Sequence, residues 1–334
     1  MATLPLTRCK HLLPYARLLG RQGEPVERIL HSARLPIDCL RDPEMLVPVG
    51  AVSRFRASCA HRTGLPDISL RATQHLQVAD LGDFGRLLST APTLRQSLRK
   101  LGDLVGTQSS DLAIDLHQRP NCEPFLCHRF LSDAGRGEWH NALYVLSWTI
   151  KIVRLADPDW SPGEIFVDAK PTPERFDVIE SLGAVARFGK RCTGFVIPEA
   201  MLALPPRQLS SVENHENGRL EATSPSTTFA AAIEQLLRSY ARDGWLSIEA
   251  ASEASGTSVR TIQRRLADEA TTYSNVLEDT RADMASELLE TTHATVGEIS
   301  QELGYANQGD FTRAFRRWSG VTPSAFRRRR QPTE

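Results

Sequence analysis

The fold of the C-terminal third of the chain is decided by residues 299–327, which read ISQELGYANQGDFTRAFRRWSGVTPSAFR. A short helical segment ends near Gly304, and a second segment follows in which Phe311, Phe315 and Trp318 recur three to four residues apart. That spacing places the three aromatic side chains on one face of a helix. Two short helices joined by a glycine-containing turn form a helix-turn-helix unit. The sequence therefore predicts such a unit here.

The same pattern occurs once more, 48 residues earlier in the chain. Residues 251–256 (ASEASG) align with residues 299–304 (ISQELG), and one extra residue in the second turn then brings Ile262 and Leu266 opposite Phe311 and Phe315. A second helix is predicted over residues 259–269, with Ser258 as its N-cap. The C-terminal region is thus predicted to be all-α, with two helix-turn-helix units.

Polar side chains lie opposite the apolar stripe of each second helix. They are Arg260, Thr261, Gln263, Arg264 and Asp268 in the first unit, and Gln308, Asp310, Thr312, Arg313, Arg316 and Arg317 in the second. Arginine pairs bidentately with guanine and glutamine with adenine in the major groove of DNA. An ordinary amphipathic surface helix would be the favoured explanation of a single copy. The repetition favours DNA binding.

Charge is segregated along the chain, although the formal net charge is zero. Residues 259–265 hold three arginines and no acid, and residues 311–330 hold seven arginines and no acid. Between them, residues 278–302 hold seven acids and only one arginine. Such segregation lets one face of a neutral domain attract phosphate. Charged runs also occur simply as solvated faces, so charge alone leaves both interpretations open.

Residues 299–305 and 311–327 closely resemble the signature of AraC/XylS-type transcription regulators, and residues 259–269 resemble their first recognition helix. The resemblance implies a bacterial DNA-binding regulator, an activator or a repressor. In such a regulator a long helix joins the two helix-turn-helix units, and this helix would be residues 273–290 here. The two units enter successive major-groove segments of double-stranded DNA. The implied base-reading residues are Arg260, Thr261, Gln263, Arg264, Gln308, Gly309, Asp310, Thr312 and Arg313. The expected phosphate contacts are Arg265, Arg316, Arg317 and Arg327.

Four residues depart from the pattern of that family. Ser255 and Thr257 occupy positions that are usually apolar, and Ala270 replaces a common glycine. Asp310 would face phosphates unfavourably unless it accepts a hydrogen bond from cytosine. Arg327 belongs to the family motif, whereas residues 328–330 are either a phosphate clamp or a solvated tail.

The first 205 residues mix helical and strand patterns, which predicts an α+β domain. Helices are expected over residues 49–61, 93–105 and 138–155, and strands over residues 112–116, 125–131, 165–167 and 194–197. Residues 206–228 are rich in proline, serine and polar residues and are predicted to be a linker. The predicted domains are therefore residues 1–205 and residues 229–330.

The N-terminal region also carries a resemblance, in residues 81–94 (LGDFGRLLSTAPTL), 185–190 (VARFGK) and 195–198 (FVIP). These stretches resemble the arabinose-binding-type N-terminal domain of regulators similar to the ornithine-utilisation activator. The resemblance implies an effector-binding or dimerisation domain and leaves the effector undefined.

Residues 138–155 are apolar on nearly every side, which predicts a helix buried in the core or in a subunit interface. Within them, Trp139, His140 and Trp148 are candidates for an effector pocket, with core packing as the favoured alternative. A homodimer formed through the N-terminal domain is the expected assembly. RNA polymerase is a further partner if the protein is an activator.

The spacing of the cysteines does not indicate a metal site. Cys122, Cys127 and His128 lie close together but match no usual zinc pattern, so reduced structural thiols are favoured over a metal or redox sensor. No common catalytic or phosphate-binding motif occurs, so we expect neither an enzyme nor a cofactor. The chain has no predicted membrane span or export signal, which favours the cytoplasm. The alternative function is a ligand-independent regulator or adaptor whose N-terminal domain binds another protein.

Overall fold

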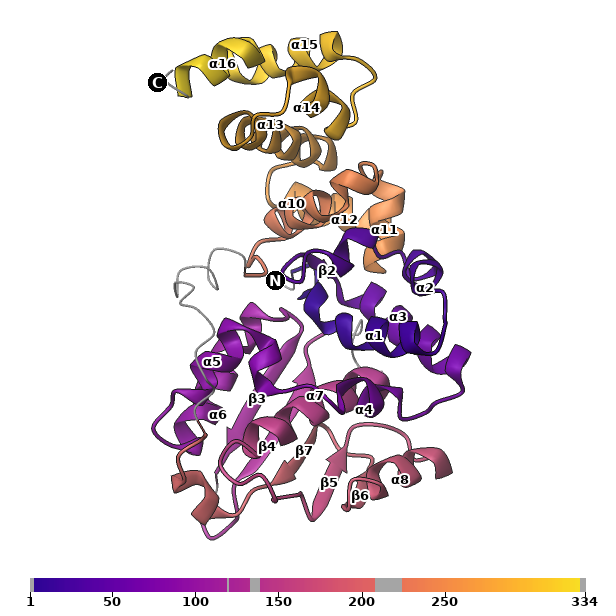
Figure 1. Cartoon of the computed structure of the whole chain (residues 1–334), viewed down its shortest axis with the longest axis vertical. Helices are drawn as coiled ribbons and strands as arrows, with labels where there is room; N and C mark the ends of the chain where they lie inside the picture. Colours follow the sequence, from indigo (N-terminus) through magenta and orange to yellow (C-terminus); the bar gives the residue numbers. More distant parts are fainter. Residues whose placement is uncertain (1–2, 119, 133–138, 208–223, 331–334) are drawn as a thin grey trace. The chain divides into compact units, whose positions relative to one another are not determined.

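The computed structural model describes residues 3–118, 120–132, 139–207 and 224–330. The chain divides into two units, residues 5–225 and residues 226–334, the latter together with residues 1–4. The first unit combines helices with β-sheet, and the second is helical throughout the residues described. The predicted fold classes of the two regions are therefore confirmed (Figure 1).

A five-stranded mixed sheet lies in the N-terminal unit, with the strand order β3-β4-β7-β5-β6. The strands are β3 (Leu112–His117), β4 (Phe125–Phe130), β5 (Glu164–Val167), β6 (Val185–Phe188) and β7 (Thr193–Val196). Strands β3, β4, β7 and β5 pair antiparallel. Strand β6 runs parallel to β5, because α8 (Pro173–Glu180) carries the chain back between them.

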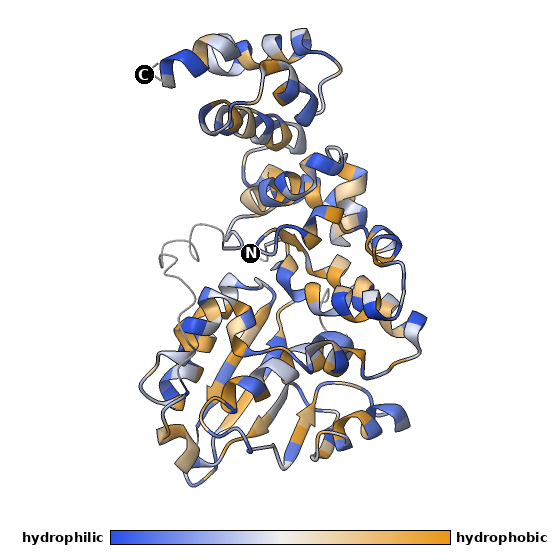
Figure 2. Cartoon of the chain, in the orientation of Figure 1, coloured by the Kyte–Doolittle hydropathy of each residue, from blue (hydrophilic) through white to orange (hydrophobic). Residues whose placement is uncertain are grey.

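Helices precede the sheet in the chain. They are α1 (Leu13–Arg21), α2 (Val26–Ser32), α3 (Val49–Thr63), α4 (Ile68–Thr73), α5 (Asp83–Ser89) and α6 (Leu94–Leu104). A small antiparallel ladder of β1 (Leu6–Arg8) and β2 (Leu46–Pro48) accompanies them. The side chains of this helical layer and the sheet share one continuous hydrophobic core. The strands of the sheet carry much of the orange, apolar colour in Figure 2.

The apolar run predicted to be a helix forms α7 (Trp139–Val153). Nearly every residue of α7 is buried, and the helix contacts α3, α4 and β7 of its own unit. Two of its polar side chains are paired: the amide nitrogen of Asn141 donates to the Ser53 hydroxyl at 2.6 Å, and Ser147 lies 2.5 Å from the Thr73 hydroxyl. The core alternative is therefore confirmed for this helix. The first residue of the predicted range, Glu138, lies outside the described residues.

The predicted helices and strands of this unit are confirmed to within two residues at each end. Strands β1 and β2 have only three residues each, which is too short for an alternating pattern to be visible in the sequence. Strand β6 was also not predicted, because Val185 and Arg187 are both exposed at the sheet edge and leave no clear apolar face.

The C-terminal unit consists of α10 (Phe229–Tyr240), α11 (Ile248–Ser255), α12 (Val259–Asp268), α13 (Tyr273–Thr291), α14 (Val296–Glu302), α15 (Gln308–Ser319) and α16 (Pro323–Arg330). Helices α10 to α15 each begin at a residue whose side chain accepts a hydrogen bond from the backbone three residues on. These caps are Thr228, Ser247, Ser258, Thr272, Thr295 and Asn307. Each cap satisfies a backbone N–H that would otherwise lack a partner, so the sequence itself fixes where these helices start.

The linker prediction leads to an expected proteolysis result. The division between the two units falls inside the predicted linker, and residues 208–223 of that linker lie outside the described residues. Limited proteolysis is expected to cut first within residues 206–228, because exposed polar segments are the preferred sites of nicking. Mass spectrometry of the first fragments checks this. First cuts inside α13 would contradict the boundary.

Among the described residues, no helix is both long enough and apolar enough to cross a membrane.

Candidate functional site

The first helix-turn-helix unit consists of α11 and α12. The turn after α11 passes through Gly256, whose φ of 72° is a left-handed conformation that favours glycine. Helix α12 then buries Ile262 and Leu266 completely. Gln263 and Arg264, which lie between these two residues, are exposed. The core stripe and the exposed stripe of α12 therefore lie as the sequence predicts.

The second unit, α14 and α15, repeats this arrangement around an aromatic core. Phe311 and Phe315 of α15 are buried with Ile299 and Leu303. Gly304 has a φ of 72°, and a Cβ added there would lie 3.1 Å from the Trp245 ring. The Trp245 indole N–H in turn donates to the Leu303 carbonyl at 2.8 Å. Glycine is thus required at this turn both by backbone conformation and by close packing.

The predicted base-reading residues of α12 have free polar groups. Within the part of the chain that the structure describes, Arg260, Gln263 and Arg264 are exposed and have no hydrogen bond or ion pair within the protein. Thr261 lies in the first turn of α12, where its hydroxyl is 2.8 Å from the Ser258 hydroxyl. Three side chains that can hydrogen-bond to base edges therefore lie exposed on one face of α12.

The corresponding residues of α15 form more hydrogen bonds and ion pairs within the protein. Arg313 forms an ion pair with Asp310, whose carboxylate also accepts a hydrogen bond from Asn307 at 2.8 Å. Gln308 and Gly309 are exposed in the first turn of α15, and the Thr312 hydroxyl donates to the Gln308 carbonyl at 2.8 Å. The pairing with Arg313 offsets the negative charge of Asp310 at a surface predicted to meet phosphates.

The four predicted phosphate contacts differ in their surroundings. Arg316 is exposed on α15, whereas the Arg265 guanidinium lies 5.2 Å from the centre of the Phe229 ring. Arg317 pairs with Glu278 of α13. Arg327 is half-buried and donates to the Leu289 carbonyl near the end of α13 at 3.3 Å. Arg327 therefore supports the packing of α16 on α13 in addition to any contact with DNA.

Glu278 ties α13 to the second unit. Its carboxylate accepts from the Trp318 indole N–H at 2.7 Å and pairs with Arg317. These two hydrogen bonds lower the pKa of Glu278, because they favour its charged form. The acidic residues of α13 thus include one with a positioning role.

The departures at Ser255 and Ala270 have physical explanations. The buried Ser255 hydroxyl donates to the Ala251 carbonyl at 2.7 Å and accepts from the Thr257 backbone N–H at 3.2 Å, so a polar residue is satisfied there. Ala270 follows the end of α12 with a φ of 56°. Its backbone N–H bonds to Ala267, and that of Thr271 bonds to Leu266. This is the usual glycine-terminated helix end, with alanine in the left-handed position.

Replacing Ala270 with glycine is expected to stabilise the C-terminal unit. The left-handed conformation costs a residue with a Cβ about 1 kcal/mol, and glycine avoids this cost. Part of the gain is offset because glycine raises the conformational entropy of the unfolded chain. We expect a gain of roughly 0.5 kcal/mol in the free energy of unfolding, measured by urea denaturation. The matched control is Ala267→Gly inside α12, which should destabilise by about 1 kcal/mol. A loss at Ala270 as large as at Ala267 would contradict this explanation.

A cavity of about 80 Å³, partly open to solvent, lies in the N-terminal unit. Most of its lining is apolar, with side chains from α3, α6, β3 and α7. The polar lining residues are Thr7, His11, Arg56, Gln108, Ser109, Asn141 and Thr149. A mostly apolar lining with a few placed polar groups is typical of small-molecule sites, and this cavity is smaller than most of them.

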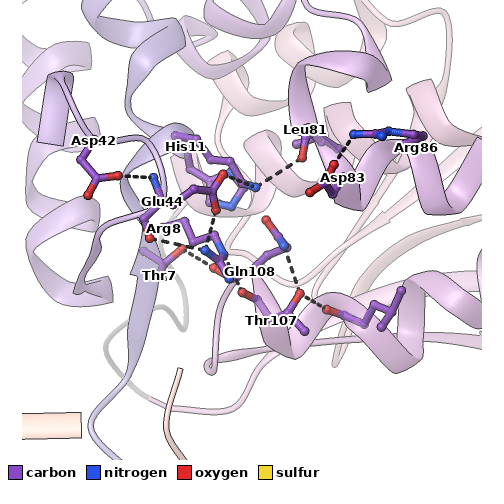
Figure 3. A network of polar contacts seen from close by, with 12 residues as sticks. Thr7, Arg8, His11, Asp42, Glu44, Leu81, Asp83, Arg86, Thr107 and Gln108 are labelled. Atoms are coloured by element: carbon purple, nitrogen blue, oxygen red, sulfur yellow. Dashed lines mark hydrogen bonds and ion pairs between the residues drawn. The ribbon is translucent and has the colours of Figure 1, made fainter. Parts of the chain in front are cut away.

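One wall of this cavity is held by the polar network in Figure 3. The fully buried Arg8 pairs with Glu44 at 2.5 Å and donates to the Thr107 carbonyl at 2.7 Å. The Thr7 hydroxyl donates to the Gln108 carbonyl at 3.2 Å. These contacts fix β1 against the segment around Gln108, so two of the polar lining residues are rigidly positioned.

The predicted pocket residues are only partly brought together. Trp148 lines the cavity, but Trp139 and His140 do not. The Trp139 indole N–H donates to the Pro66 carbonyl at 3.2 Å, and its ring packs against Phe188. Burial lowers the pKa of His140 to about 4, which keeps its imidazole neutral. Trp139 and His140 therefore lie in packed surroundings outside the cavity.

Arg56, Tyr144 and His11 line the cavity but were not predicted from the sequence. They come from α3, α7 and the 3-10 turn before α1, so no local motif joins them. The one signal in the sequence is Arg56 itself, a charged residue inside a helix whose neighbours Val52, Phe55 and Cys59 are core residues.

The cysteines are all free thiols, as expected. Cys127 and His128 are both buried in β4, whereas Cys122 is exposed in the turn before it. Within the described ranges, no group of three histidine, cysteine or acidic side chains could hold a metal ion.

Two family models match the chain. One, described as a helix-turn-helix domain, matches residues 251–329. The other, described as the N-terminal arabinose-binding domain of AraC transcription regulators, matches residues 23–206. The second match alone covers more than half of the 334 residues.

Individual proteins are also similar to this chain. The transcriptional regulator VirS of Mycobacterium tuberculosis is 29% identical over 332 residues, which is 96% of each chain. The ornithine utilization regulator of Pseudomonas aeruginosa is 30% identical over 154 residues, 44% of this chain and 45% of that one. The crystal structure of the regulator CdpR from Pseudomonas aeruginosa aligns with 94% of this chain and 96% of its own, with 21% identity and a TM-score of 0.41. The chain spans about a fifth of the length of the first curated relatives that it matches.

The duplicated helix-turn-helix and these matches define a DNA-binding transcription regulator and not an enzyme. Within that class, the chain belongs to the AraC family of transcription regulators.

Proposed function

We propose that α12 and α15 read two successive segments of the major groove of double-stranded DNA, and that the N-terminal unit controls this binding by taking up a small molecule. The single observation that carries the DNA part is the exposed set of Arg260, Gln263 and Arg264, which pairs with none of the described residues and lies beside the buried stripe of α12. Long side chains without partners within the protein are free to reach base edges. The exposed Arg316 of α15 supports this, because it suits a phosphate contact.

The salt dependence of binding tests this proposal. A protein that neutralises phosphates releases bound counterions, so the logarithm of its affinity falls with the logarithm of salt, by about 0.9 for each phosphate on duplex DNA. We expect the full-length chain to lose affinity steeply between 50 and 200 mM salt, and Arg316→Ala to lower the slope by about 1. Fluorescence anisotropy with a labelled duplex measures both. A flat salt response would favour the alternative, an adaptor that binds another protein.

We also propose that the N-terminal unit forms a homodimer, with RNA polymerase as a further partner if the protein activates transcription. The burial of α7 within its own unit removes the reason that the sequence offered for a dimer. The remaining reason is energetic, since linking two DNA-binding units can raise avidity by roughly 10² to 10⁴.

Residues 1–205 are therefore expected to sediment as a dimer at tens of micromolar, and the full-length chain likewise. Analytical ultracentrifugation of both proteins measures this. If both are monomers at that concentration, dimerisation through the N-terminal unit is wrong.

A further inference from the structure

Among the residues that the structure describes, the cavity of the N-terminal unit contains a cation and no counter-charge. Arg56 of α3 is only 6% exposed and lines the cavity. No aspartate or glutamate is among the lining residues. Within the described ranges, no carboxylate lies within ion-pair distance of this guanidinium either.

Neutral groups hold Arg56 in place. One terminal nitrogen donates to the Asn141 side-chain oxygen at 2.8 Å, and the other lies 3.4 Å from the His11 carbonyl oxygen. The guanidinium stands 4.2 Å from the centre of the Tyr144 ring. Its Nε–H is buried and has no hydrogen-bond partner among the described residues. A buried arginine is thus oriented by its neighbours but is left with an unused donor and an unbalanced charge.

The other polar groups of the cavity do not supply the missing charge. Burial, together with the nearby Lys10 and Arg56, holds the pKa of His11 well below its usual value, so this imidazole stays neutral. The side-chain oxygen of Gln108 is buried and also lacks a partner, whereas its amide nitrogen donates to Thr107 at 3.0 Å. The cavity therefore has one positive group, one free acceptor and an apolar lining.

Leaving a charge buried and unpaired is strongly destabilising, whereas a well-placed counter-ion with good hydrogen bonds recovers much of that cost. We propose that this cavity binds a small organic monocarboxylate with an apolar body, whose carboxylate pairs with Arg56 and whose body packs among the lining of α6, β3 and α7. The inference deepens the proposed function, because it rests on the N-terminal unit being the effector site and names the chemical class of the effector.

The same lining sets a limit on the ligand. An ammonium group would find no carboxylate in the cavity, so burying it beside Arg56 would add a second unpaired cation. A carboxylate that also carries an amine is therefore expected to bind poorly, and a neutral amide of the same shape would not neutralise Arg56.

Three matched probes test the proposal on the full-length chain without DNA. They are hexanoate, hexanamide and 6-aminohexanoate, titrated by isothermal calorimetry and followed in parallel by the melting temperature of the N-terminal unit. We expect hexanoate to bind at least roughly tenfold more tightly than either other probe. Arg56→Gln should abolish this preference, because glutamine can keep the Asn141 hydrogen bond without the charge. Arg62→Gln, on the same helix but exposed and paired with Glu24, should keep it.

Stability without ligand gives a second measurement. Because Arg56→Gln removes an unbalanced buried charge, its melting temperature without ligand should equal or exceed that of the unmodified chain. With added hexanoate, the unmodified chain should have the higher melting temperature. Equal binding of all three probes, or a hexanoate preference that survives in Arg56→Gln, would overturn the proposal. So would the absence of binding by hexanoate and by a bulkier carboxylate, phenylacetate. Because no DNA is present, such a failure leaves the proposed DNA reading by α12 and α15 standing, and the salt-dependence experiment tests that separately.

Discussion

Arg264→Ala is expected to weaken binding at the preferred DNA site by about 1 to 3 kcal/mol, roughly 5- to 150-fold, and to weaken binding to random DNA much less. The physical reason is that the exposed guanidinium of Arg264 has no partner among the described residues and can pair bidentately with a base edge. Affinities of the full-length variant for both DNAs, measured at one salt concentration, check this.

The matched control is Arg316→Ala on α15, an exposed arginine predicted to contact phosphate. A phosphate contact carries no sequence information, so this variant should lose similar affinity for the two DNAs. Equal losses for Arg264→Ala on both DNAs would show that Arg264 also contacts phosphate only.

Phe315→Ala is expected to reduce the free energy of unfolding of the C-terminal unit by about 3 to 5 kcal/mol. Phe315 is 1% exposed, and its ring lies 5.8 Å from that of Phe311 and 5.3 Å from that of Phe326. The alanine variant therefore leaves a cavity where α15 and α16 pack together. Urea denaturation of the full-length chain, followed by tryptophan fluorescence, measures the loss.

The neighbouring Arg316→Ala serves again as the control, because an exposed substitution usually changes stability by less than about 0.5 kcal/mol. The Phe315 variant should also lose the protection of the DNA segment that α15 covers. A variant as stable as the Arg316 control would contradict the assignment of Phe315 to the core of the second unit.

The sequence predicted the C-terminal unit well because its signals are local. Apolar residues three to four apart define the buried faces of α12 and α15, and a side-chain cap such as Ser258 or Thr295 marks where each helix begins. The left-handed turn at Gly304 is likewise visible as a glycine that directly follows Ile299 and Leu303, two apolar residues at helical spacing. The duplication makes each of these signals appear twice.

The cavity in the N-terminal unit could not be predicted in this way. Arg56, Gln108 and Asn141 come from segments far apart in the chain and meet only after the helical layer packs against the sheet. The sequence pointed instead to Trp139 and His140, because aromatic residues on an apolar helix look alike whether they face a cavity or packed neighbours. The partners of Arg313 and Arg317 were missed for a related reason: an exposed arginine does not reveal in the sequence whether an acid such as Glu278 lies opposite it.

The charge pattern also has a structural counterpart. The end of α16 is strongly hydrophilic in Figure 2, where Arg328 and Arg329 are exposed. In contrast, some acids of α13 form ion pairs within the C-terminal unit. For example, Glu287 of α13 pairs with Arg238 of α10 at 3.2 Å. A formal net charge near zero is therefore compatible with a basic DNA-facing surface.

The central claim is that two recognition helices of one chain read two segments on one face of DNA. Selection of bound sites from random duplex DNA by the full-length protein, followed by footprinting of the selected sites, tests it most directly. The account predicts two short sequence blocks per monomer, about one helical turn or 10 base pairs apart, with Arg264→Ala relaxing only the block that α12 contacts. Recovery of no common sequence, or of a single block that Arg264→Ala and Phe315→Ala affect alike, would contradict it.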